Sequence, residues 1–184
     1  KAGALYCEAL SRLGLSKLLY DAGKDQEADG HIAWVAQVAR EVNGKLLECV
    51  ESFISAEVAF ARGDESRGLE ALRKGLGIGA VGESTYPMWC DKAMWARLCA
   101  KALEAAIEPA YVHKLIRIMR LAPEGSACQC DAWPWPLRVN MLGRFAVQAD
   151  GKPLVMTRKT PRRLLELLQV IVAFGQDNVP ISRV

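Results

Sequence analysis

Apolar residues recur every three or four positions through the first two thirds of the chain, which is the period of an amphipathic helix. Polar or glycine-containing breaks, such as Asn43-Gly44 and Gly63-Asp64, separate these stretches. Asparagine and glycine tolerate the left-handed backbone that ends a helix, and Asp64 can cap the helix that follows. The expected buried faces are Leu5, Ala9, Leu13, Leu18 and Leu19; Ile32, Val35, Ala39 and Val42; Leu47, Val50, Ile54, Val58 and Ala61; Leu69, Leu72 and Leu76; Trp95, Leu98, Ala102 and Ala106; and Val112, Leu115 and Met119.

The breaks between the predicted helices are short, so neighbouring helices should pack antiparallel. The pair Lys45–Ala61 and Asp64–Gly79 has about the size of one helix-turn-helix repeat of ~34 residues. We therefore expect tetratricopeptide-like hairpins over residues 1–121, with an irregular α-bundle as the alternative. Small residues mark the places where these two helices should approach closely, namely Ala56, Ala59, Gly68, Ala71 and Gly75.

Residues 122–136 have a different composition, rich in proline, glycine and serine, and they contain Trp133-Pro134-Trp135-Pro136. Proline restricts itself and the preceding residue to extended conformations. The segment is therefore predicted to be a linker or docking strap. We expect its two tryptophans to bury themselves against a domain and to hold that domain at a defined angle.

The period changes to two after Pro136, as expected for β-strands. Alternation is interrupted at Gly143, which predicts a bulge or bend, and Asp150-Gly151 is a strong hairpin-turn pattern. A helix is predicted at Pro161–Phe174. The pattern over 137–184 therefore favours an antiparallel sheet with this helix packed against it. The strand residues are Leu137, Val139, Met141, Phe145, Val147 and Pro153 to Met156, and the helix places Leu164, Leu168 and Ile171 on one face with Leu167 and Phe174 beside it.

Together these patterns predict a mainly α chain in which helical hairpins are followed by a small α+β element. Charge adds one distinction. The net charge is only +3, but residues 137–184 carry eight basic and three acidic residues, whereas 1–136 carry 16 basic and 18 acidic residues. Four basic residues gather where the predicted helix begins, a position at which backbone N–H groups also favour anions. The candidates for contacts to DNA phosphates are Arg158, Lys159, Arg162 and Arg163, and the alternative is a solvated face or ion pairs with Glu166.

Four segments in this order carry a resemblance to a known family: Trp133–Val139, Leu142–Phe145, Asp150–Leu154 and Arg158–Leu168. They resemble the OmpR-type winged helix of the antibiotic-regulatory-protein kind found in bacterial transcription regulators. The stretch Ala96–Glu108, with Tyr111-Val112 and Leu115-Ile116 after it, is similar to the end of the helical-repeat sensor in large maltose-regulator-like, ATP-dependent members.

The resemblance implies a fragment of a transcription regulator in which a helical sensor or oligomerisation module, residues 1–121, is joined by 122–136 to the front of a winged helix, 137–184. In that family the helix that reads bases comes later, so it lies outside this sequence and no residue here is a candidate for base readout. The family also places a nucleotide-binding domain before the repeats. No Gly-x-x-x-x-Gly-Lys-Ser/Thr loop occurs here, so ATP is expected only for such a preceding domain.

The sequence offers little for other chemistry. No nucleophile, base and acid combination occurs at a catalytic spacing, so we expect no enzyme activity. Cys128-Gln129-Cys130 lacks the Cys-x-x-Cys spacing of zinc sites, and His31 and His113 lie on separate predicted helices, so we expect no metal and an exposed dithiol instead. The scattered cysteines favour reduced thiols in a cytoplasmic protein, and no apolar run approaches the ~20 residues that span a membrane.

A cluster of aromatic residues suggests a possible effector or peptide groove, for which Tyr86, Trp89 and Trp95 are the candidates. The alternative is that these side chains pack in the core. Self-association is also expected, through the repeats or through the exposed apolar residues Leu167 and Ile171, and a dimer is the form we anticipate. A helical-repeat interaction scaffold that does not bind DNA is the second hypothesis for the whole chain.

Overall fold

The computed structural model describes residues 2–82, 91–123, 125, 128, 130–143, 145–154 and 162–175. Seven helices and a three-stranded antiparallel sheet are present in these ranges, so the chain is mainly α with a small β element. The chain divides into two compact units, Lys1–Trp133 and Pro134–Val184. The segment 122–136, predicted as one linker, is therefore shared between them.

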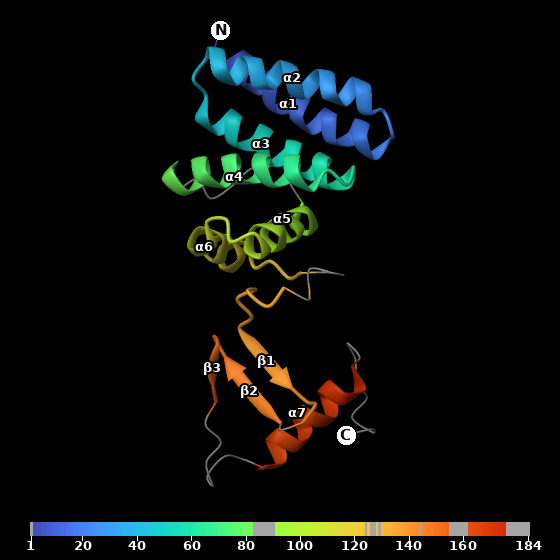
Figure 1. Cartoon of the computed structure of the whole chain (residues 1–184), viewed down its shortest axis with the longest axis vertical. Coiled ribbons are helices and arrows are strands. Elements are labelled where there is room, and N and C mark those ends of the chain that lie inside the picture. Colours follow the sequence, from blue (N-terminus) through green and yellow to red (C-terminus); the bar gives the residue numbers. More distant parts are fainter. Residues whose placement is uncertain are drawn as a thin grey trace. The chain divides into compact units, whose positions relative to one another are not determined.

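The first unit consists of helices that pack as consecutive hairpins (Figure 1). The first helices of the hairpins, α1, α3 and α5, also contact one another in that order. In the described part of the chain, no helix has both the length and the apolar character needed to cross a membrane. The six helices are α1 (Ala2–Asp21), α2 (Asp25–Glu41), α3 (Lys45–Ala61), α4 (Glu65–Gly82), α5 (Lys92–Glu104) and α6 (Pro109–Met119).

The ends of the helices are determined by residues that the sequence already shows, namely residues that adopt positive φ and aspartates that cap helices. Asn43 and Gly63 adopt positive φ values of 50° and 78°, so the chain can leave α2 and α3 and reverse within two or three residues. Asp64 accepts a hydrogen bond from the backbone N–H of Arg67 at 3.1 Å, and Asp91 caps α5 in the same way. The turn at Gly63 closes the α3–α4 hairpin, and the turn at Asn43 joins this hairpin to the preceding one.

Close packing within the α3–α4 hairpin depends on glycine. The ring of Phe53 lies so near Gly75 that a Cβ there would stand 2.9 Å from Cε1 of Phe53, and Gly68 leaves similar room for Phe60. The ring of Phe53 also makes an edge contact with Trp95 of α5, with ring centroids 4.8 Å apart at an angle of 63°. One phenyl ring therefore links both helices of a hairpin to the next hairpin.

The apolar face of α1 is narrower than predicted. Ala9 and Leu13 are buried, but Leu18 is 66% exposed and Ser16 is buried in its place. Ser16 tolerates this position because its hydroxyl donates to the carbonyl oxygen of Leu13 at 2.7 Å. The expectation that Leu18 continues the buried face was wrong.

The end of the first unit folds back onto its helices. Trp133 and Cys130 are both buried, and the Nε2 atom of His113 on α6 lies 3.0 Å from the carbonyl oxygen of Ala132. Residues up to Trp133 thus belong to the helical unit instead of bridging away from it. The expected burial is therefore confirmed for Trp133, whereas Trp135 is only half-buried.

The second unit contains strands β1 (Leu137–Asn140), β2 (Ala146–Ala149) and β3 (Lys152–Pro153), which pair antiparallel in that order. Asp150 and Gly151 connect β2 to β3 with φ values of 48° and 74°, the two positive values of the turn that matches strand twist. Gly143, with φ 78°, lies in the connection between β1 and β2. The predicted sheet and hairpin are confirmed, although the predicted strand residues Met141 and Phe145 lie just outside β1 and β2. Val155 and Met156 of the predicted third strand lie outside the described residues.

The helix predicted after the sheet is present as α7 (Arg162–Phe174). The burial of α7 agrees with the prediction only in part. Leu165 and Leu168 are half-buried, whereas most of the apolar face predicted as buried is exposed. The exposed side chains are Leu164, Leu167, Ile171 and Phe174.

Gly75→Ala is expected to destabilise the helical unit because the new methyl group meets the ring of Phe53, which Trp95 prevents from moving. Overpacking of this kind lowers the free energy of unfolding by about 1–3 kcal/mol. Gly77→Ala is the matched control on the same helix, since its Cβ would meet nothing within 4 Å. The control should be neutral or gain up to about 1 kcal/mol from helix propensity. Urea unfolding that ranks the two variants equally would disprove the packing account.

Candidate functional site

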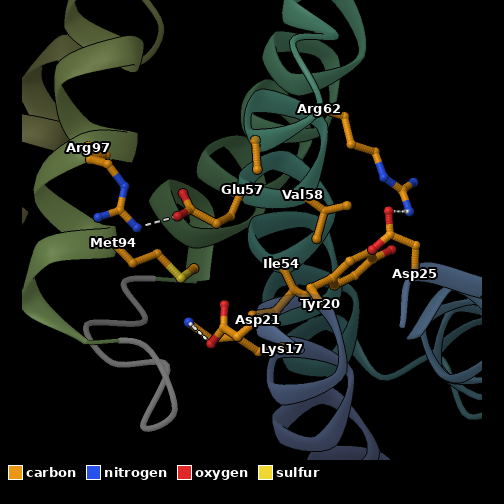
Figure 2. A pocket seen from close by; sticks show the side chains of 11 residues that line it. Lys17, Tyr20, Asp21, Asp25, Ile54, Glu57, Val58, Arg62, Met94 and Arg97 are labelled. Carbon is orange, nitrogen blue, oxygen red and sulfur yellow. Dashed lines mark hydrogen bonds and ion pairs between the residues drawn. The ribbon is translucent and has the colours of Figure 1, made fainter. Parts of the chain in front are cut away.

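A cavity of about 300 Å³ opens where the first helices of the three hairpins lie side by side (Figure 2). We call it the charged hollow. Its walls come from α1, α3 and α5, together with the first residue of α2. The lining residues are Lys17, Tyr20, Asp21, Asp25, Ile54, Glu57, Val58, Ala61, Arg62, Met94 and Arg97.

One wall of the charged hollow is a cluster around Arg62, which extends from the end of α3. Its guanidinium contacts Asp25 and Asp29 on α2, each at 3.2 Å, and lies 5.0 Å from the ring centroid of Tyr20. The hydroxyl of Tyr20 donates a hydrogen bond to Asp29. This network holds the ends of α1, α2 and α3 together at the edge of the cavity.

The network changes the titration of its members. Burial and the hydrogen bond to Asp29 raise the pKa of Tyr20 to about 12. Burial opposes ionisation of Asp29, but hydrogen bonds from Tyr20 and Arg62 outweigh it and lower the pKa of this carboxyl. The Arg62 pKa is raised, first by its hydrogen bond to Asp29. At neutral pH the cluster therefore contains the neutral phenol of Tyr20, the carboxylate of Asp29 and the guanidinium of Arg62.

The opposite wall is formed by α5. Figure 2 shows Arg97 and Met94 on this side, facing Glu57 on α3, and Arg97 forms an ion pair with Glu57. Below them Lys17 pairs with Asp21 on α1 at 3.1 Å. Each charged pair is partly exposed, and such pairs contribute about 0–1 kcal/mol. Their partners can therefore be exchanged for those of a ligand at small cost.

A second depression of about 440 Å³ adjoins the charged hollow and shares Lys17 and Ile54 with it. We call it the apolar hollow, because Lys17 is the only charged residue among those that line it. The other lining residues are Ser11, Leu13, Gly14, Leu15, Leu18 and Val50, from α1 and α3. The two hollows meet at Lys17 and Ile54, and we refer to them together as the groove.

The aromatic groove predicted from sequence is not this one. Tyr86 and Trp89 lie outside the described residues. Trp95 is buried against Phe53, so it belongs to the core and lines no groove, which corresponds to the packing alternative. Its indole N–H has no hydrogen-bond acceptor in the described part of the chain.

Of the four basic residues predicted to contact phosphates, Arg158 and Lys159 lie outside the described residues. Arg162 is the first residue of α7, and Arg163 is exposed in its first turn. Arg162 and Arg163 thus occur at a helix N-terminus, where anions are favoured.

The expected exposed dithiol is not present in this form. Cys128 is exposed, but Cys130 is buried with its sulfur 4.0 Å from the carbonyl oxygen of Ala100. Burial raises the pKa of the Cys130 thiol, and it raises those of Cys49 and Cys99 to about 11 and about 12. No group of three or more possible metal ligands occurs in the ranges that the structure describes.

The residues of the groove escaped sequence analysis because they are far apart along the chain. Lys17 and Asp21 have the spacing of an ordinary helix-surface ion pair, and Arg62 precedes a glycine-containing break. Only the stacking of three hairpins brings them around one cavity. Leu18 is the one groove residue that the hydrophobic pattern singled out, but the pattern placed it in the core. Comparison with known proteins adds no assignment: no family model, no curated protein and no solved structure matches this chain.

Tyr20 should ionise well above the ordinary tyrosine pKa of about 10. Because folding raises this pKa, the stabilisation is fully present below about pH 10 and is lost as the pH rises through about 12. The difference in phenolate absorbance between the chain and Tyr20→Phe isolates this titration, with circular dichroism showing that both remain folded. A midpoint at the ordinary value would mean that the hydrogen bond to Asp29 does not persist in solution.

Alkylation should separate the thiols by burial. At about pH 8, Cys7 and Cys128 should react first, since both are exposed. Cys49, Cys99 and Cys130 should react only after unfolding, because they are buried and their raised pKa values keep them protonated. Peptide mapping by mass spectrometry identifies the modified sites. Equal labelling of Cys128 and Cys130 in the folded chain would argue against the docked end of the helical unit.

Proposed function

We propose that this chain is part of a transcription regulator, in which the helical unit binds a signal or partner and the C-terminal unit is the front of a winged-helix DNA-binding domain. The observation that carries the proposal is the order of elements after Trp133. Three antiparallel strands are followed by an amphipathic helix that begins with Arg162 and Arg163. This is the order that the resemblance implies for the first part of such a domain.

The repeat character of the helical unit supports the same proposal. Three consecutive antiparallel hairpins stack so that α1, α3 and α5 are neighbours, and small residues admit rings between helices. Stacked hairpins of this kind offer extended surfaces for binding. We propose that they are tetratricopeptide-like repeats and that the protein acts in the cytoplasm, with ATP used only by a separate nucleotide-binding domain.

The exposed apolar face of α7 supports a further part of the proposal, self-association. Leu167 and Ile171 are exposed on one helix of a small unit. Apolar patches of this kind often lie in interfaces between copies of a chain. A dimer is the form we propose.

A second candidate is an interaction scaffold that does not bind DNA. The groove across α1, α3 and α5 favours it, because the groove belongs entirely to the helical unit. The two functions are distinguished by the basic residues of α7, which only the regulator uses.

DNA affinity of this chain should be weak, salt-dependent and indifferent to sequence, since α7 can reach phosphates only. Fluorescence anisotropy with a labelled duplex measures it. Arg162→Gln with Arg163→Gln should lower the slope of log affinity against log salt by about 2. Arg40→Gln with Arg73→Gln is the control, because both side chains are exposed on the helical unit. An equal change in the two double variants, or no measurable binding, would contradict the DNA-binding proposal.

A further inference from the structure

The groove along the first helices has a consistent polarity along α1. Leu15 and Leu18 lie at the apolar hollow, and Asp21 follows Leu18 by one helical turn at the charged hollow. Residues three or four apart share a helix face. A ligand that lies along α1 therefore meets apolar side chains first and a carboxylate next.

Two leucine side chains are exposed to solvent at the apolar end of the groove. Leu18 is 66% exposed, and Leu15 beside it is exposed as well. Ser11 and Gly14 complete the rim of the apolar hollow with small side chains, which leaves room for an entering group. Covering these leucines would remove apolar surface from water, which is favourable.

The two ends of the charged hollow differ in which partner is exposed: Arg97 on the α5 wall is 53% exposed and its partner Glu57 21%, whereas beside α1 and α2 the carboxylates are the exposed members. The side chains of Asp21 and Asp25 are 61% and 54% exposed, whereas those of their partners Lys17 and Arg62 are only 27% and 35% exposed. Arg62 is also held by Asp29 and by the ring of Tyr20. The carboxylates therefore present their free edges to solvent, and an incoming cation can add to them without breaking the existing pairs.

We propose that this groove binds a peptide segment of a partner protein that places apolar side chains against Leu15 and Leu18 and a basic side chain between Asp21 and Asp25. The inference rests on the helical unit being the part of the chain that binds partners, as in both functions considered above. The exposed leucines favour a peptide with apolar side chains over a wholly polar one. The neighbouring carboxylates favour a basic peptide over an acidic one.

The spacing within the peptide follows from helix geometry. Leu18 and Asp21 are three residues apart on α1 and share a helix face. At 1.5 Å per residue this is about 4.5 Å along the axis. An extended peptide covers that distance in one or two residues of about 3.3 Å each. The preferred segment thus has an apolar residue followed within about two positions by lysine or arginine.

The test uses the whole chain and three fluorescent peptides of one length. The first carries two leucines followed by arginine at this spacing, the second has glutamate in place of arginine, and the third has serines in place of the leucines. Anisotropy should show binding of the first peptide and a loss of about tenfold or more for the third, since leucine burial supplies the apolar contribution. The second peptide should bind more weakly than the first.

Variants of the chain locate the site. Asp21→Asn with Asp25→Asn should weaken binding of the first peptide roughly three- to tenfold, as two exposed ionic contacts allow. Leu15→Ser with Leu18→Ser should abolish it, and circular dichroism checks that both variants fold. Glu70→Gln is the control, because Glu70 is exposed on α4 away from the groove, and it should bind as the unchanged chain does.

Three results would overturn the proposal: equal binding of the arginine and glutamate peptides, equal binding by the Asp21 and Asp25 variant and the control, or a dimer in sedimentation that disappears in the leucine variant. The last would show that a second copy of the chain covers the groove. Failure here is distinguishable from failure of the DNA-binding proposal, because the salt titration of the α7 arginines uses no residue of the groove.

Discussion

The contact between Phe53 and Trp95, made possible by the missing side chain at Gly75, is the constraint on which the helical unit depends. It joins α3, α4 and α5 through one ring, with the Phe53 and Trp95 centroids 4.8 Å apart. The indole N–H of Trp95 is buried without an acceptor in the described residues, and its ring packs against Phe53. The packing of α3 against α5 also positions Met94 and Arg97, which form the α5 wall of the charged hollow.

Local signals made the helical hairpins and the small sheet predictable. Asn43, Gly63 and Asp150-Gly151 act within a few residues of their own position, so the sequence announces the turns they form. The periodicity also identified Leu13, Leu72 and Leu115 as core residues. Gly68 and Gly75 were predictable as points of close approach, because glycine weakens a helix interior and is favoured there where a neighbouring helix leaves no room for a side chain.

The groove and the burial of single residues were not predictable, since both depend on contacts distant in sequence. Leu18 continues an apolar stripe and is nevertheless 66% exposed, in the lining of the apolar hollow. Cys130 is close to Cys128 in sequence but lies buried near Ala100, about thirty residues away along the chain. Likewise α7 has the expected period, yet much of its predicted buried face is exposed among the described residues.

The central claim is that the first helices of stacked hairpins form the binding face of this chain. A photoreactive group placed between the leucines and the arginine of the peptide, followed by mass spectrometry of the cross-linked residues, tests it most directly. The account predicts attachment on α1 and α3, between Ser11 and Asp21 and between Val50 and Arg62, and loss of attachment when unlabelled peptide competes. Attachment on α4 or α6, or attachment that competition does not reduce, would contradict it.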